Sequence, residues 1–364
     1  MRVLNRFRVI VFFALLPQWG IAAIRPSFTG DSDAWRSTDI VVVSLSATDG
    51  NFVVEEIWKG NLRLGVRVVV PELIPERDAV SVSLYPEFWK SPEGWNSRIA
   101  EQIPRQPVGS RLILFLKKKP SNSEEVEWEP ANWMHSMKAS VVWIDGEQLW
   151  SFGQIVNPGP SVLQPMGSIS VQELRGRISK VLQTQKAIQS VIEIQNGLQR
   201  AQLLKPFLRS DVHVARRLAM EELGKSGPTA VPTIRGMLDD PEYADDSPEL
   251  IKAMVEAGGA AVGSDLNHRF QHEIAFWESV GPTLAVGWWN KDPNGNAPLR
   301  LRYSQLNQLI MGLQQIRSKD SLPAARELDQ LWVSNPQLND PSGLNQISVE
   351  CEKLIKLVQE EGAD

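Results

Sequence analysis

Residues 211–238 carry two apolar patterns with the period of an α-helix, separated by a short turn. The apolar positions are Val214, Leu218, Met220 and Leu223 in the first helix, and Val231, Ile234, Met237 and Leu238 in the second. Gly224 and Gly227 can adopt the left-handed conformation that ends a helix, and Pro228 discourages the first helix from continuing. Two short helices cannot bury both apolar faces by themselves, so the pattern predicts further helices packed beside them.

Similar helical patterns continue toward the C-terminus, with an interruption at residues 288–298. The predicted helices are 248–258, 260–280, 302–316, 322–333 and a closing helix 344–360. The run 216–224 (RRLAMEELG) followed by 230–234 (AVPTI) resembles a HEAT repeat, with a small residue in the first helix and an apolar-proline step opening the second. This resemblance implies an all-α, HEAT-like solenoid of three to four pairs, whose extended surface binds proteins or peptides. An irregular helical bundle is the alternative.

The N-terminal half carries short runs with strand character, rich in β-branched residues and separated by turns. The predicted strands are 39–47, 51–58, 66–70, 80–84, 111–118, 140–144 and 148–152. The run 111–118 (RLILFLKK) is almost continuously apolar, which predicts a central strand covered on both faces. The last two runs flank Asp145-Gly146-Glu147 and are expected to form a hairpin. Short strands at such spacing predict a β-barrel or β-sandwich.

Three stretches of this half occur in a recognisable order: 39–43 (DIVVV), 53–60 (VVEEIWKG) and 108–116 (VGSRLILFL). The arrangement resembles bacterial exported domains related to the netrin and tissue-inhibitor-of-metalloproteinase module, over about residues 39–166. The resemblance implies an all-β, OB-like barrel. The animal inhibitors of that class chelate the protease zinc with a mature N-terminal cysteine. This chain has no cysteine there, so protease inhibition is not implied.

A long helix is expected over residues 171–204, with Ser170 and Glu173 forming a capping box at its start. Its apolar stripe consists of Leu174, Ile178, Val181, Leu182, Ile188 and Ile192. The stripe predicts a helix packed across a domain joint; a coiled-coil dimer seam is the alternative, although Gln185 and Gln195 interrupt it. The predicted segments are a signal peptide 1–23, an OB-like β domain 24–166, a connecting helix 167–205 and a HEAT-like solenoid 206–364.

Residues 1–23 have the pattern of a secretory signal peptide: a basic start, an apolar run at 9–16 and small residues at 20–23. The apolar run is shorter than the roughly 20 residues of a spanning helix, and no other segment approaches that length. We therefore expect export to the periplasm or the medium, with no stable membrane span after cleavage. An uncleaved anchor is the alternative. The net charge of −5 argues against nucleic acid as a partner, because phosphate binding needs a concentrated basic face.

Cys351 is the only cysteine, so the chain has no internal disulfide. It lies on the apolar face of the last predicted helix with Leu344, Ile347, Leu354, Ile355 and Val358. This placement predicts a buried, inert thiol. Pairing with another chain and a nucleophilic role are the alternatives.

His268 and His272 lie four residues apart, which places both imidazoles on one face of a helix, as in some zinc sites. Asp265 or Glu273 could add a carboxylate, but the order of residues is not that of the zincin motif. The chain also lacks a Gly-x-Ser-x-Gly nucleophile elbow and a phosphate-binding loop. We therefore predict two solvated or locally hydrogen-bonded histidines, with no catalytic residues, metal or cofactor; a metal-dependent hydrolase using both histidines is the alternative.

Four further segments contain residues that a binding site could use. The acidic stretch 239–246 and the stretch 291–296 could hold calcium through clustered oxygens, but neither has the spacing of a calcium loop, so solvated loops are expected. The glycines at 258, 259 and 263 indicate close helix packing. Trp128 and Trp133 could stack on sugar rings or bind a partner protein, and otherwise cover the β domain.

These observations favour an exported, non-enzymatic binding or scaffold protein whose helical half contacts an unidentified protein or peptide. The two alternatives are the hydrolase centred on His268 and His272, and carbohydrate binding by the β domain through Trp128 and Trp133.

Overall fold

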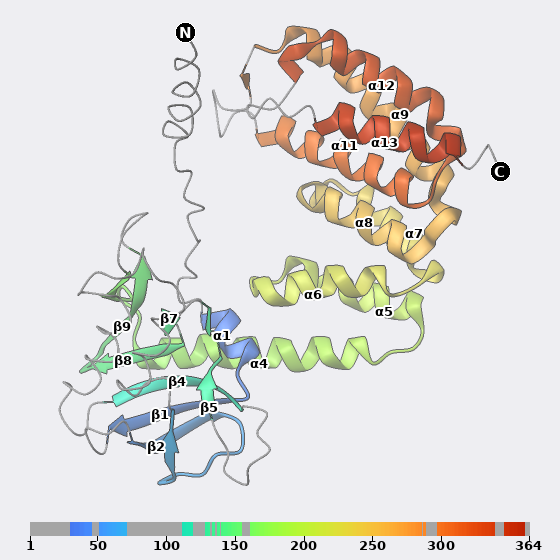
Figure 1. Ribbon diagram of the computed structural model, residues 1–364. Helices are drawn as coiled ribbons and strands as arrows, with labels where there is room; N and C mark the ends of the chain where they lie inside the picture. The colour runs from blue at the N-terminus through green and yellow to red at the C-terminus, as the bar shows by residue number, and fades with distance from the viewer. Residues whose placement is uncertain are drawn as a thin grey trace, which may run out of the picture. The chain divides into compact units, whose positions relative to one another are not determined.

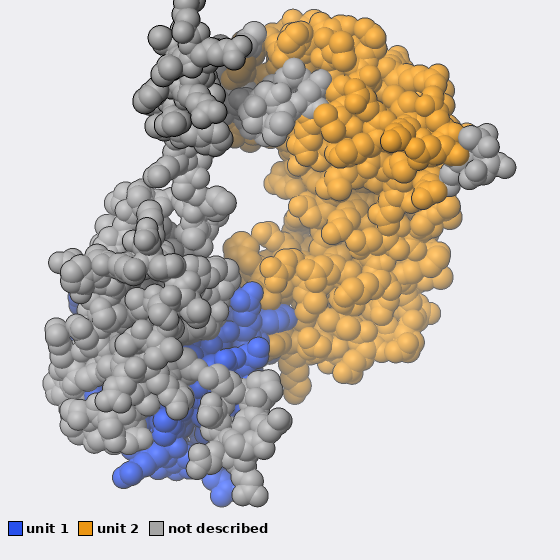
Figure 2. Space-filling view, viewed as in Figure 1, with its two compact units in different colours: residues 1–183 blue, residues 184–364 orange. Residues whose placement is uncertain are grey.

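The computed structural model describes most of the chain as two compact units, residues 1–183 and 184–364 (Figure 2). The described residues are 30–45, 51–70, 111–118, 128–131, 133–134, 137–138, 140–154, 161–285, 287–288, 297–338 and 346–360. The predicted signal peptide 1–23, the predicted strand 80–84 and the stretch 291–296 lie outside them.

The first unit is an antiparallel β region, as predicted, preceded by a short helix (Figure 1). The elements are α1 (Gly30–Arg36), β1 (Asp39–Leu45), β2 (Asn51–Lys59), β3 (Arg67–Val69), β4 (Arg111–Lys118), β5 (Trp128–Pro130), β6 (Trp133–Met134), β7 (Met137–Lys138), β8 (Val141–Asp145), β9 (Gln148–Gln154) and β10 (Ser161–Pro165). The main sheet has the order β10-β9-β8-β4-β1-β2-β3, with β5 also paired to β4. Strands β6 and β7 pair separately. Gly146 has a positive φ of 59° in the turn between β8 and β9, which confirms the predicted hairpin.

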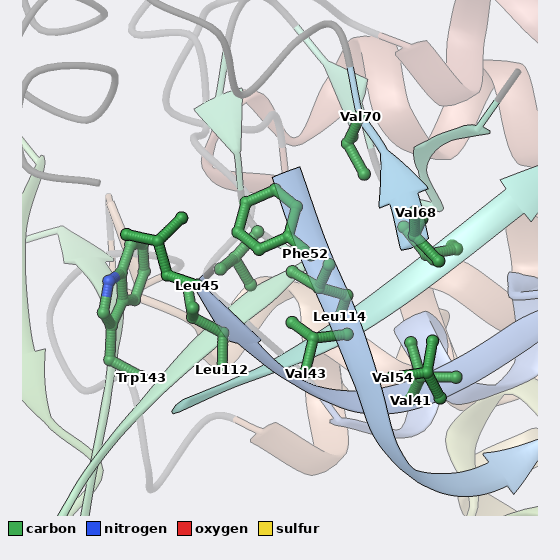
Figure 3. Close-up of a cluster of buried hydrophobic side chains, with 12 residues drawn as sticks. Val41, Val43, Leu45, Phe52, Val54, Val68, Val70, Leu112, Leu114 and Trp143 are labelled. Carbon is green, nitrogen blue, oxygen red and sulfur yellow. The ribbon is translucent and has the colours of Figure 1, made fainter. Parts of the chain in front are cut away.

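Strand β4 is central, because it pairs with β1 on one side and β8 on the other. Residues 112–116 of β4 are all buried, so both faces are covered and the prediction for this strand is confirmed. Figure 3 shows the cluster on one face, where alternate residues of β1, β2, β4 and β8 converge. Its members are Val41, Val43, Leu45, Phe52, Val54, Val68, Val70, Leu112, Leu114, Leu116, Val141 and Trp143.

The remainder of the described chain is helical, which confirms the predicted order of a β region followed by an α region. The helices are α4 (Val171–Ile192), α5 (Gly197–Leu204), α6 (His213–Gly224), α7 (Val231–Leu238), α8 (Ser247–Gly258), α9 (Gly263–Val280), α11 (Ala297–Gln315), α12 (Leu322–Ser334) and α13 (Gln346–Glu360). Short 3-10 turns join many of them: η3 (Lys205–Arg209), η4 (Pro228–Ala230), η5 (Pro241–Asp246), η6 (Gly259–Val262), η7 (Gly281–Thr283), η8 (Lys319–Ser321) and η9 (Pro336–Leu338). Across these helices, no apolar stretch meets the length and hydropathy that a bilayer crossing requires.

Alternate helices of the second unit pack on one another along the chain (Figure 1). Helix α6 packs on α5 and α8, α8 packs on α11, and α11 packs on α13. Helices α6 and α7 were expected to form a packed pair, but α7 packs most extensively against α8. Gly227 has the expected positive φ of 78°, whereas Gly224 stays helical and lies against Glu256 of α8. Gly258 similarly allows close contact with Val231 of α7, so the predicted close helix packing at that glycine is confirmed.

The prediction of one continuous connecting helix over 171–204 was wrong in one respect, because the helix ends at Ile192. Asn196 is extended and its side chain accepts a hydrogen bond from the Gln199 amide, which starts α5 as a new helix. At the other end, the predicted capping box is present. The Ser170 amide donates to the Glu173 carboxylate at 2.7 Å, and the Glu173 amide donates to the Ser170 hydroxyl at 3.2 Å.

Cys351 lies in α13 and is fully buried. Burial raises the pKa of its thiol, and nearby acidic side chains add to the shift. The nucleophilic thiolate is therefore disfavoured, which supports the prediction of an inert thiol.

Candidate functional site

A groove of about 920 Å³ opens on the helical unit, between one face of α9 and one face of α11. Helix α8 contributes part of its lining, and α7 and η5 contribute to it as well. Its residues are Arg235, Leu238, Asp239, Asp240, Pro241, Ala244, Ser247, Ile251, Asp265, His268, Arg269, His272, Glu273, Pro298, Leu301, Arg302, Gln305 and Leu309. It contains both histidines singled out from the sequence.

Helix α9 presents a charged face to the groove because its polar residues recur at helical spacing. These residues are Asp265, His268, Arg269, His272 and Glu273. The opposite face carries the buried Leu266, Phe270, Ile274 and Trp277, which fix the rotation of the helix. Packing of the apolar face therefore determines that both histidines point into the groove.

Two arginines connect α9 to the end of α7. Arg235 donates to the Asp265 carboxylate at 2.8 Å, and Arg269 donates to Asp239 at 2.6 Å. Arg269 also lies 3.4 Å from Asp265, so the four side chains form a continuous ion-pair network. Asp265 is only 17% exposed, which reduces solvent screening of the network relative to an isolated surface pair.

A third arginine connects α9 to α11. Arg302 donates to both oxygens of Glu273, at 2.7 and 3.2 Å. The Glu273 side chain is 6% exposed, and the Arg302 guanidinium lies 3.7 Å from the centre of the Phe276 ring. This bidentate geometry holds the guanidinium plane in one orientation. Ion pairs therefore join α9 to the end of α7 and to α11, which both line the groove.

We expect Glu273→Ala to lower the free energy of unfolding by about 2 kcal/mol, because Arg302 would keep most of its burial without a carboxylate partner. Urea unfolding followed by circular dichroism measures the change. Glu221→Ala is the matched control: its pair with Arg217 is exposed on both sides, and we expect less than about 0.5 kcal/mol. Equal losses for the two variants would contradict a structural role for the Arg302 pair.

His268 and His272 are both exposed on the groove side of α9, and the contacts of the described chain give neither a hydrogen-bond nor an ion-pair partner. The predicted juxtaposition on one helix face is present. No group of three or more histidine, cysteine, aspartate or glutamate side chains suited to a metal occurs in the part of the chain that the structure describes. The nearby carboxylates of Asp265 and Glu273 are already bonded to arginines. The two carboxylates of α9 that lie beside the imidazoles in the groove are thus both committed to arginines.

The acidic stretch 239–246 forms the turn η5 and is held by basic side chains. Asp240 caps this turn by accepting from the Glu242 amide at 3.0 Å. Arg209 donates to Asp246 at 2.7 Å and lies over the ring of Tyr243, 4.1 Å from its centre. These contacts explain the acidic residues as parts of an inter-helix turn, in agreement with the expected loop.

The two tryptophans considered for carbohydrate binding lie in short strands. Trp128 is in β5, half-buried, and packs against the apolar cluster of the main sheet. This position fits the covering role. Trp133 is in β6, and its side chain is outside the described part of the structure.

The structure also reveals a buried polar cluster beneath α1 that the sequence analysis did not identify. Ser140 donates to the Asp33 carboxylate at 2.6 Å, and the Lys59 ammonium donates to the Ala34 carbonyl at 3.0 Å. Burial lowers the pKa of Lys59, and the negative charge of Asp39 opposes that shift. The contacts join α1 to β2 and to the start of β8, so we interpret the cluster as an anchor for α1. The Lys59-Gly60-Asn61 turn was its only sequence signal.

No protein-family model, no curated protein and no solved structure matches this chain. The function must therefore be inferred from the groove and its chemistry.

Proposed function

We propose that this is an exported, non-enzymatic binding or scaffold protein whose helical half holds a protein partner in the groove between α9 and α11. The observation that carries the proposal is the pre-organised groove itself. Arginine–carboxylate pairs hold α9 to both neighbouring walls, so little order would have to be gained on binding. Its mixed polar and apolar lining is typical of protein-binding surfaces.

We propose further that the helical half is a HEAT-like solenoid, and that the β half is an OB-like barrel or sandwich of the netrin-related kind. The stacking of α6, α8, α11 and α13 in succession supports the first assignment, since repeat helices contact their sequence neighbours. The antiparallel meanders on either side of β4 support the second. Export is proposed from the pattern of residues 1–23.

A photo-crosslinking amino acid placed at Gln305 tests the proposed partner site. Gln305 lines the groove, whereas Gln330 lies exposed on α12 outside it and provides the matched control. The full-length protein is expressed in its native compartment, irradiated, and analysed for adducts by mass spectrometry. We expect a defined protein adduct at Gln305 and none at Gln330. Equal labelling at the two positions, or no adduct at either, would contradict the proposal.

A further inference from the structure

Three of the four carboxylates in the groove are bonded to its three arginines, and the fourth, Asp240, caps the turn η5. The bonded pairs are Arg235 with Asp265, Arg269 with Asp239, and Arg302 with Glu273. A strongly charged ligand would have to compete with these pairs and would lose its own hydration. The groove therefore has no concentrated charge of either sign to attract an acidic or basic segment.

Two imidazoles and one amide are the polar side chains of the groove that have no partner among the described contacts. His268, His272 and Gln305 line it, and the described contacts give none of them a partner. The two histidines lie one helical turn apart on α9, and Gln305 faces them from α11. Neutral imidazole offers one donor and one acceptor, and a glutamine amide offers both kinds of group. These are the groups needed to bond the N–H and C=O of an extended peptide.

The remaining lining residues favour a peptide over other neutral ligands. Leu238, Pro241, Pro298 and Leu301 provide partly or fully exposed apolar surface along the same groove. None of its lining residues is a phenylalanine, tyrosine or tryptophan, so it lacks the large apolar rings on which sugars stack. Apolar contacts beside main-chain hydrogen bonds are the combination that extended polypeptides use.

We propose that the groove binds an extended, uncharged polypeptide segment, with His268, His272 and Gln305 bonding its main chain and the apolar lining accepting its side chains. This inference rests on the proposed binding function and names the class of ligand that the site takes.

Fluorescence anisotropy with the full-length protein tests the proposal. The probes are labelled peptides of about ten residues, ~33 Å when extended, built from leucine, valine, serine and glycine. Matched peptides carry four lysines or four glutamates. We expect the neutral peptide to bind at least about tenfold more tightly than either charged one.

Three variants assign the effect to the histidines. His268→Ala with His272→Ala should weaken neutral-peptide binding at least about tenfold, because two hydrogen bonds are lost. His268→Gln with His272→Gln should retain binding, since the glutamine amide keeps both a donor and an acceptor. His213→Ala, an exposed histidine on α6 outside the groove, is the control and should change nothing. Circular dichroism checks that every variant remains folded.

Preference for a charged peptide, or unchanged binding after loss of both histidines, would overturn this inference. Failure of the neutral peptide to bind would do the same, yet would leave the proposed function standing if crosslinking at Gln305 still captured a protein. Absence of both peptide binding and crosslinking would remove the two proposals together.

Discussion

Replacing Trp277 by alanine is expected to lower the free energy of unfolding of the helical unit by about 4 kcal/mol. Trp277 is fully buried in α9. Its ring lies edge-on to Trp332 at 5.5 Å between centroids and to Tyr303 at 6.4 Å, and 6.1 Å from Trp288. Trp277 therefore joins α9 to α11 and α12. Its removal would leave a large cavity that the surrounding aromatic side chains cannot fill.

Urea unfolding of the full-length protein, followed by far-ultraviolet circular dichroism, measures this change. Val333→Ala on α12 is the control, because Val333 is 59% exposed, next in sequence to Trp332, and should change the stability by less than about 0.5 kcal/mol. A loss for Trp277→Ala as small as that of the control would show that the aromatic cluster does not hold α9, α11 and α12 together.

Gly197→Ala is expected to destabilise the helical unit by about 3 kcal/mol. A Cβ atom at Gly197 would lie 1.9 Å from the backbone carbonyl oxygen of Ser226 and 2.8 Å from the Thr229 hydroxyl oxygen. The carbonyl cannot move away alone, because it belongs to the turn between α6 and η4. The start of α5 would have to separate from that turn.

Gly236→Ala is the matched control, and its expected effect has the opposite sign. Gly236 lies within α7, and apart from the neighbouring residues and backbone of that helix no atom lies within 4 Å of the position that a Cβ would take. Alanine has the higher helix propensity, so we expect stabilisation of about 1 kcal/mol. Thermal and urea unfolding measure both variants. Stabilisation by both substitutions would contradict the close approach of α5 to the Ser226 turn.

The helices and strands were largely predictable because each depends on a local pattern. The strand 111–118 and the helix 322–333 were recognised within one residue of β4 and α12, from apolar spacing and flanking turn residues. The capping box at Ser170 and the turn at Gly146 needed only neighbouring residues.

The break before α5 was not predicted, although Asn196-Gly197 was a visible signal. The apolar stripe ends at Ile192 and is interrupted at Gln195, so the local pattern allowed a break there as well as one continuous helix. The reason for glycine at 197 is a contact with Ser226, which lies 29 positions further along the chain. The packing partner of α7 was missed for the same reason, since a helix pattern does not specify which neighbour covers its apolar face.

Part of the candidate site was predictable from local sequence patterns, and part depended on the tertiary structure. The spacing of His268 and His272 on α9 was sufficient to place both imidazoles on one face, because α-helical geometry is local. The sequence alone also determined the order of a β region and an α region, together with the burial expected for Cys351. Only the tertiary structure decided that Arg235 and Arg302 neutralise the carboxylates beside the histidines, since these partners lie 30 and 29 residues away in sequence. Ion pairs between helices depend on how apolar faces pack, and that packing is a property of the whole fold.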